Sequence, residues 1–193
     1  MKHLYTSDWH IGHKNILKFT NRGVETLDEM NHLLIQNYNA QANSNTIGYF
    51  LGDMVFDFNE GKEVLSQLNG LKVLVRGNHD KKPTGMLKVG FDICLEEAVI
   101  KRVGHYIKLS HFPYQYPPIP LWRKVLLKEK QHDVRFAGRR PIDKGGWLLH
   151  GHTHEKEQIK NKMIHVGVDA WNMRPVNESD IQSLISKALG ERK

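Results

Sequence analysis

Short apolar runs that each end in polar, metal-capable residues set the pattern of this chain. Residues 4–6, 47–51, 71–75, 106–109 and 147–149 are rich in apolar side chains, and Asp, Asn or His follows each run two or three residues later. Runs of this length are typical of buried β-strands. The pattern therefore predicts strands that deliver polar side chains at their carboxyl ends.

Helix-like spacing separates these strands. In residues 27–42 apolar side chains recur every three or four positions, which predicts an amphipathic helix. Shorter helices are expected at 60–68, capped by Asn59, and at 179–189. Partial alternation on both sides of Gly104 predicts a hairpin. Strands that alternate with helices predict an α/β or α+β fold built as a layered sandwich.

One segment interrupts this order. Residues 113–146 contain five prolines and carry eight Lys or Arg against three acidic residues. We expect a single domain over residues 1–193 with a basic, Pro-rich excursion at about 113–146, including a short helix near 121–129. The excursion is either a lid or a surface loop. Clustered positive charge attracts phosphate-bearing partners, although many such runs are only solvated surface.

Composition narrows the class of protein. Hydrophobic residues make up 39% and charged residues 25% of the 193 positions, which is typical of a globular domain. The single cysteine, Cys94, excludes an intrachain disulfide, and the N-terminus lacks the apolar run of a signal peptide. No stretch is apolar enough to span a membrane. We expect a cytoplasmic protein without a membrane partner, and the oligomeric state stays open.

The polar residues after the strands form short motifs. In chain order they are Asp8-Trp9-His10, Gly52-Asp53, Gly77-Asn78-His79-Asp80, Ser110-His111 and Gly151-His152-Thr153-His154. Each motif alone has an ordinary structural explanation, such as a turn or a buried histidine. In open α/β sheets, however, ligand sites gather outside the carboxyl ends of the strands, so these motifs are expected to converge. Imidazole, carboxylate and amide together suit divalent transition metals.

The ordered motifs resemble the calcineurin-like metallophosphoesterase superfamily, and the segment 168–176 looks like its small prokaryotic and phage members. The resemblance covers residues 4 to about 170. It implies a four-layer sandwich of two mixed β-sheets flanked by helices, with the metal site at the carboxyl ends of the strands. The protein phosphatase branch carries Gly-Asp-x-Val-Asp-Arg-Gly at the second motif, whereas this chain has Gly52-Asp53-Met54-Val55-Phe56-Asp57 and so lacks the Asp-Arg-Gly. That departure disfavours phosphoprotein substrates.

The resemblance also implies roles for individual residues. Asp8, His10 and His154 would bind a first metal, Asn78, His111 and His152 a second, and Asp53 would bridge the two. His79 would then be the general acid, with Asp80 orienting its ring. His13 and Arg174 are candidates for substrate contacts. Two divalent ions are expected, Mn²⁺ first, with Fe, Zn, Ni or Mg as alternatives.

These roles predict a hydrolase that cleaves a phosphodiester or a phosphomonoester by attack of a metal-bound hydroxide at a dinuclear centre. A small, nucleotide-like substrate is favoured. One alternative is a nuclease acting on DNA or RNA, for which the basic segment 113–146 would supply the phosphate contacts. A second is a catalytically idle, metal-stabilised binding module. His79 argues against it, because a purely structural site has no use for an additional imidazole beside a ligand.

Overall fold

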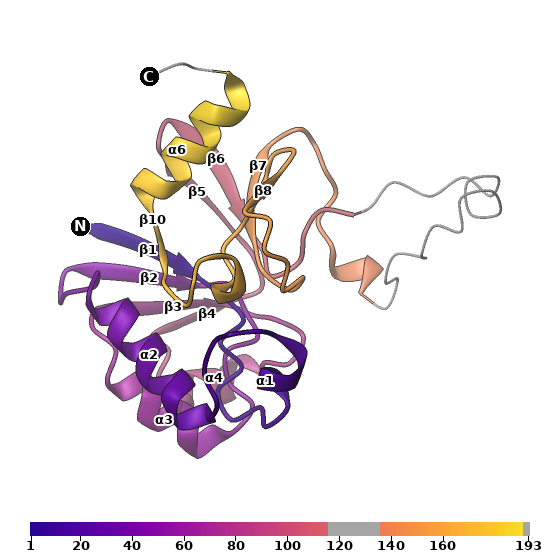
Figure 1. Ribbon diagram of the computed structural model, residues 1–193. Helices are drawn as coiled ribbons and strands as arrows, with labels where there is room; N and C mark the ends of the chain where they lie inside the picture. The colour runs from indigo at the N-terminus through magenta and orange to yellow at the C-terminus, as the bar shows by residue number, and fades with distance from the viewer. Residues whose placement is uncertain (116–135, 191–193) are drawn as a thin grey trace.

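Two five-stranded sheets form the centre of the protein, seen here in a computed structural model that describes residues 1–115 and 136–190 (Figure 1). In the first sheet the strand order is β10-β1-β2-β3-β4. Strands β1 to β4 run parallel and β10 pairs antiparallel with β1. The bounds are β1 (Lys2–Thr6), β2 (Thr46–Phe50), β3 (Leu71–Val75), β4 (Ile93–Leu95) and β10 (Val176–Asn177).

The second sheet has the order β5-β6-β7-β9-β8. Its three central strands, β6, β7 and β9, are parallel, and the outer strands β5 and β8 are antiparallel to their neighbours. The bounds are β5 (Ala98–Arg102), β6 (His105–Leu109), β7 (Trp147–His150), β8 (Ile159–Lys160) and β9 (Met163–His165). Both sheets are therefore mixed, which confirms the predicted fold class and the hairpin around Gly104.

The described helices are α1 (Ile16–Phe19), α2 (Leu27–Asn39), α3 (Phe58–Ser66), α4 (Pro83–Val89) and α6 (Glu178–Leu189). A capping box between Thr26 and Glu29 fixes the start of α2. The expected cap of α3 was wrong. Asp57, not Asn59, caps this helix, because its carboxylate lies two residues further upstream and accepts the N–H groups of Asn59 and Glu60.

Alternate residues of strands in the first sheet pack into two separate cores. Leu4 of β1 packs with residues of α2, α3 and α4, whereas its neighbour Tyr5 packs with apolar residues of the second sheet. Helix α6 adds Ile181 and Ile185 to the second core. Figure 1 accordingly shows α2, α3 and α4 on one side of the first sheet, and the second sheet and α6 on the other. The period of two in the strands thus produces the layers.

Part of the predicted excursion lies outside the described residues. The expected helix near 121–129 falls within positions 116–135, and so does the middle of the segment considered as a lid. After this gap the chain resumes with the 3₁₀ turn η1 (Ala137–Arg139) and leads into β7. None of the helices in the described part of the chain has the length and apolar character needed to cross a membrane.

Candidate metal centre

The predicted metal ligands come together in two groups. Asp8, His10 and His154 form one group and Asp53, His111 and His152 the other, and within each group the candidate ligand atoms all lie within 4.8 Å of one another. The residues come from loops that follow β1, β2, β6 and β7. Because β1 and β2 are parallel, as are β6 and β7, their carboxyl ends bring these loops together.

Direct contacts connect the two groups. The backbone N–H of His152, in the second group, donates to the carboxylate of Asp8 in the first at 3.0 Å. Within the second group, His111 Nε2 lies 3.1 Å from Asn78 Oδ1 and 3.4 Å from Asp53 Oδ2. The amide oxygen of Asn78 therefore lies beside the second group. Oxygen and imidazole donors of this kind suit divalent transition metals.

His10 is the clearest sign that the site is built for a ligand. Its ring is buried, and neither Nδ1 nor Nε2 has a hydrogen-bond partner among the residues that the structure describes. Buried polar atoms are almost always hydrogen-bonded, because an unsatisfied one costs about 1–3 kcal/mol. A ring nitrogen that binds a metal has no such deficit. The donor set and this unpartnered imidazole therefore fit a bound divalent cation.

The backbone around the site is strained. Asp8, His10, Asp53, His152 and His154 all have positive φ angles, between 53° and 75°. Such left-handed conformations cost of the order of 1–2 kcal/mol for residues other than glycine. Strain of this kind persists at sites where it positions side chains for function. Glycine is required at Gly151, where a Cβ atom would collide with the side chains of Ser7 and Asp8.

Two buried carboxylates dominate the electrostatics of the site. Asp8 is fully buried, and burial together with the nearby charge of Asp53 raises its pKa. Burial acts in the same direction on Asp53, but its hydrogen bond and charge interaction with His111 outweigh this and hold its pKa well below the usual range. Two close carboxylates away from water require positive charge beside them. The site therefore attracts cations.

The histidines respond to the same charges. Burial and the neighbouring His154 lower the pKa of His10 to about 2, while burial and the neighbouring His111 lower that of His152 to about 3. Both rings are therefore neutral at neutral pH, the form in which imidazole binds metals. Burial also opposes the charged form of His111, but the hydrogen bond and charge of Asp53 outweigh it and raise the pKa of His111 to about 9.

Asp169 is a site residue that the sequence prediction missed. Its buried carboxylate accepts His154 Nδ1 at 2.7 Å and two hydrogen bonds from Arg22, each at 3.0 Å. This contact leaves Nε2 as the ring nitrogen of His154 that is available to a metal. Arg22 also donates to the carbonyl oxygens of Asp8 and Trp9, so one buried ion pair orients both ends of the first group.

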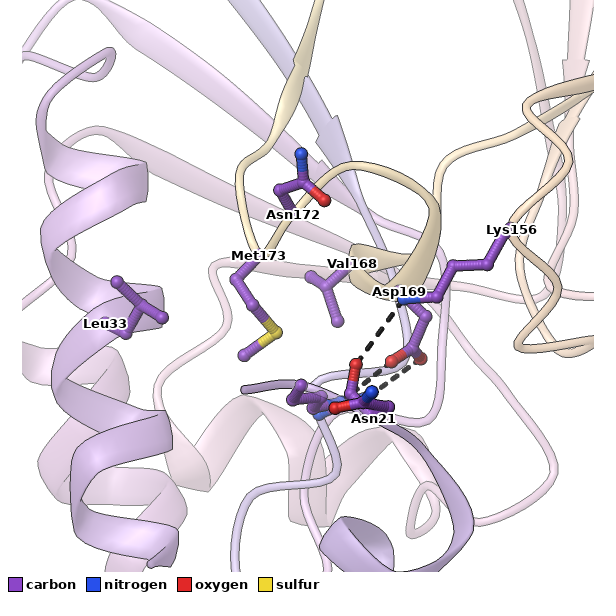
Figure 2. A pocket seen from close by; sticks show the side chains of 8 residues that line it. Asn21, Leu33, Lys156, Val168, Asp169, Asn172 and Met173 are labelled. Atoms are coloured by element: carbon purple, nitrogen blue, oxygen red, sulfur yellow. Dashed lines mark hydrogen bonds and ion pairs between the residues drawn. The ribbon is translucent and has the colours of Figure 1, made fainter. Parts of the chain in front are cut away.

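A cavity of about 130 Å³ adjoins this ion pair. Figure 2 shows the Asp169 carboxylate directed toward the loop that carries Asn21, with Val168 and Met173 on the apolar side of the cavity. Lys156 closes the opposite side, since its ammonium group lies 3.5 Å from the carbonyl oxygen of Asn21. In sequence the segment 168–176 only resembles the small members of the superfamily, and nothing in it indicates that Asp169 supports His154.

His79 lies beside both groups. Its ring is half exposed, Nε2 lies 3.9 Å from Asp53 Oδ2, and its backbone N–H donates to Asp53 Oδ1. The predicted contact between Asp80 and this ring is not what the described residues show. Instead the Asp80 carboxylate accepts the backbone N–H groups of Asp53, Met54 and Gly77. Asp80 therefore holds two loops of the site together. Its carboxylate binds buried backbone N–H groups more strongly than it would bind the half-exposed ring of His79.

The two predicted substrate contacts have different surroundings. The ring of His13 lies 5.5 Å from that of His10, next to the first group. Arg174 is instead paired with Asp180, at 2.8 Å, and its guanidinium lies 4.9 Å from the ring of Trp171. Because Asp180 already neutralises this cation and also belongs to the capping box of α6, the geometry disfavours a phosphate contact by Arg174.

Arg139 provides a different cation next to the site. Its guanidinium lies 5.0 Å from the centroid of Phe112, and Nη2 lies 3.4 Å from the carbonyl oxygen of Gly77. The Phe112 ring in turn packs 4.9 Å from His111 and 4.8 Å from His152. Arg139 falls in the basic segment 113–146 but carried no motif that distinguished it from the other basic residues there.

Comparison with known proteins relates the whole chain to proteins that have no stated function. No protein-family model matches it. The chain is 32% identical to the uncharacterized protein MJ1445 of Methanocaldococcus jannaschii, over 97% of this chain and 93% of that protein. It is 28% identical to the Gene 66 protein of Mycobacterium phage L5, over 94% and 93% of the two chains.

Two solved structures are similar in shape. A protein of unknown function from Aquifex aeolicus, AQ665, has a TM-score of 0.68 and 27% identity, with 95% of this chain and 98% of that chain covered. A novel archaeal phosphodiesterase is more distant, with a TM-score of 0.42 and 14% identity over 86% and 82% of the chains. Similarity at that second level supports no conclusion about activity.

Proposed function

The chain belongs to the family of the Methanocaldococcus jannaschii protein MJ1445, and we propose from the geometry of the candidate site that it is a metal-dependent phosphoesterase of the calcineurin-like type. Its substrate is a phosphodiester or a phosphomonoester, with the diester favoured. The reaction is hydrolysis within a single domain. Two divalent cations, Mn²⁺ first among the candidates, occupy the two groups of ligands.

The observation that carries this proposal is the pair of adjacent ligand groups, each with its candidate ligand atoms within 4.8 Å of one another. The first group includes the buried ring of His10, which has no hydrogen-bond partner among the described residues. A single structural metal would explain one such group. The two groups are in contact, since His152 donates to Asp8 and the charges of Asp8 and Asp53 interact, and such adjacent groups are expected where two cations act on one substrate.

The protein residues have separate tasks in this proposal. Asp8, His10 and His154 hold one cation, Asn78, His111 and His152 hold the other, and Asp53, which lies in the second group, would contact both. When bound, the cations supply an activated water and offset the charge of the phosphate. Asp169 fixes the orientation of His154, and Asp80 fixes the loops that carry Asp53 and Asn78.

His79 is the general acid in this proposal. Its ring is half exposed, so that substrate can reach it, and it lies within 4 Å of Asp53 without belonging to either ligand group. A proton on Nε2 is therefore placed to pass to the oxygen of the leaving group. The leaving group then departs as a neutral alcohol, which avoids the cost of expelling an alkoxide.

The proposal is tested by hydrolysis of bis(p-nitrophenyl) phosphate and p-nitrophenyl phosphate, with Mn²⁺ and after treatment with EDTA. Turnover should require the metal. Asp53→Asn should abolish it, because the substitution removes the only carboxylate of the second group and with it the proposed bridge to the first. With a diester whose leaving group is an alcohol, such as a dinucleotide, His79→Ala should lower kcat by about 10²- to 10⁴-fold, the usual contribution of a general acid, while leaving the metal content unchanged. Turnover of the p-nitrophenyl esters should fall much less, because p-nitrophenolate leaves without a proton.

Matched controls separate chemistry from folding. Asp28 and His32 are exposed on α2, away from the motifs, so Asp28→Asn and His32→Ala should retain full turnover. Metal-loaded protein that turns over neither ester, or an Asp53→Asn variant with unchanged turnover, would exclude the proposed reaction at this site. The nuclease alternative depended on basic residues that lie mostly outside the described residues, so no observation favours it over the smaller substrate.

A further inference from the structure

A row of aromatic rings leads outward from the candidate metal centre. The Phe56 ring packs 5.0 Å from His10, 4.4 Å from His13 and 4.8 Å from His79, measured between ring centroids. His13 in turn lies 6.1 Å from Phe19. The row thus connects a proposed metal ligand, the proposed general acid and the surface of the protein.

Phe19 is the exposed end of this row. It is the last residue of α1, and 73% of its surface is accessible to solvent. An isolated exposed phenylalanine is ordinary, but this ring continues a line of rings that begins at the centre. Because the Phe19 ring is open to solvent and lies beside the His13 imidazole, the two rings offer a surface on which a planar partner can stack.

Two exposed lysines lie close to Phe19 along the chain. Lys14 and Lys18 are both exposed, and Lys18 immediately precedes Phe19 in α1. An aromatic ring flanked by lysines is the combination with which proteins bind nucleotides, because the ring stacks on the base and the lysines attract the phosphate. An acyl chain would instead need an enclosed apolar groove, and a single ring flanked by ammonium groups does not provide one.

We propose that Phe19 and His13 form a shelf for the base of a nucleotide whose phosphate lies at the metal centre, so that the substrate of the proposed phosphoesterase is a nucleotide. The inference rests on the proposed function for the place of the phosphate, whereas the shelf itself follows from the ring contacts. Phe56 supports the shelf from behind, since His10, His13 and His79 surround it. Phe19 and His13 are then residues that determine specificity.

The test compares two ligands that differ only in the base. Adenosine 5′-monophosphate and ribose 5-phosphate are titrated by calorimetry into the Mn²⁺-loaded protein, its Phe19→Ala variant and its Phe19→Tyr variant. The unmodified protein should bind the adenosine ligand more tightly by about 5- to 150-fold, the range expected for stacking of one base. Phe19→Ala should remove most of this preference, and Phe19→Tyr should retain it because the ring remains.

Tyr106→Ala is the matched control, because Tyr106 is 70% exposed and lies on β6 in the second sheet. It should leave both affinities unchanged. Substituting an exposed side chain also leaves folding nearly unaffected, so Phe19→Ala reports on binding. A 5′-phosphorylated oligoadenylate extends the test: affinity equal to that of the monomer identifies a free nucleotide as the ligand, and tighter binding that Phe19→Ala weakens identifies the end of a strand.

Turnover of bis(p-nitrophenyl) phosphate in the same samples separates this inference from the proposed function. Equal affinity for the two ligands in a protein that hydrolyses the ester would overturn the shelf and leave the phosphoesterase intact. A base preference that Phe19→Ala removes in a protein without turnover would support the shelf and remove the phosphoesterase.

Discussion

Replacing Asp169 by Asn probes how the interior of the protein supports the candidate metal centre. The carboxylate accepts three hydrogen bonds, two from Arg22 and one from His154, and both the Asp169 and the Arg22 side chains are almost fully buried. Asn keeps the shape of the side chain but removes the charge. It also turns one acceptor oxygen into an NH₂ group, which then faces a donor of Arg22 or of His154.

The expected loss is large because the guanidinium of Arg22 becomes an uncompensated buried charge. Removing one partner of a buried ion pair costs about 3–5 kcal/mol, a large fraction of the roughly 5–15 kcal/mol that stabilises a domain. Burial opposes ionisation of Asp169, but the hydrogen bonds from His154 and Arg22 outweigh it and hold its pKa below the usual range. This contribution is therefore fully present above the unfolded pKa of about 3.9 and is lost only as the pH falls below it.

Urea unfolding at pH 7 in the presence of EDTA measures this loss of stability. The substitution should also weaken metal binding by about 10- to 100-fold, because His154 loses its partner at Nδ1, and a Mn²⁺ titration of the folded protein measures this. Glu97→Gln is the control, because Glu97 pairs with Lys108 at the surface and should contribute at most about 1 kcal/mol.

A double variant keeps the test decisive if Asp169→Asn fails to fold. Replacing Arg22 by Gln as well removes the uncompensated charge, so the double variant should be more stable than the sum of the single changes predicts. A loss below about 1 kcal/mol for Asp169→Asn, or unchanged metal affinity, would refute the assigned role of the ion pair.

Three further outcomes follow from the same geometry. Arg139→Ala should raise KM for a phosphoester several-fold at unchanged metal content, since its guanidinium beside Phe112 lies next to the second ligand group. Steady-state kinetics at constant salt measure this, and an unchanged KM would show that Arg139 does not contact the substrate. Burial lowers the pKa of His165 from 6.5 to about 3, so the unfolded state binds the extra proton and the free energy of unfolding falls as the pH drops below 6.5. In EDTA between pH 7 and pH 5.5 the wild type should lose about 1 kcal/mol more than His165→Asn, and equal losses would contradict the assignment. Asp80→Asn should destabilise the protein by about 1–3 kcal/mol in thermal or urea unfolding and weaken metal binding, because Asn cannot accept all three backbone N–H groups. A metal affinity equal to that of the wild type would show that Asp80 does not hold the loops in place.

The periodic elements of the fold could be predicted from the sequence because their information is local. The alternation that separates Leu4 from Tyr5, and the recurrence of apolar residues in 27–42, follow directly from the geometry of strands and helices. Short elements such as α1 and α4 were missed, since few residues give too little periodicity. The order of strands within each sheet was also beyond reach, because pairing depends on contacts between distant segments.

The candidate ligands were predictable for a different reason. Metal-binding side chains stand in short motifs directly after apolar runs, and a parallel sheet brings such positions to one edge. Their supporting residues carry no local signal: Arg22 and Asp169 are separated by 147 positions and meet only in the folded chain. The same limitation explains Asp80 and Arg174, whose partners are backbone groups and a helix cap that a motif does not reveal.

The most direct test of the two-metal site is a calorimetric titration of EDTA-treated, dialysed protein with Mn²⁺ at neutral pH, with diester hydrolysis measured at each point. The account predicts two bound ions per chain and turnover that rises as the second ion binds, with both effects impaired in Asp53→Asn. Binding of less than one ion by folded protein, or full turnover with a single ion bound, would contradict it.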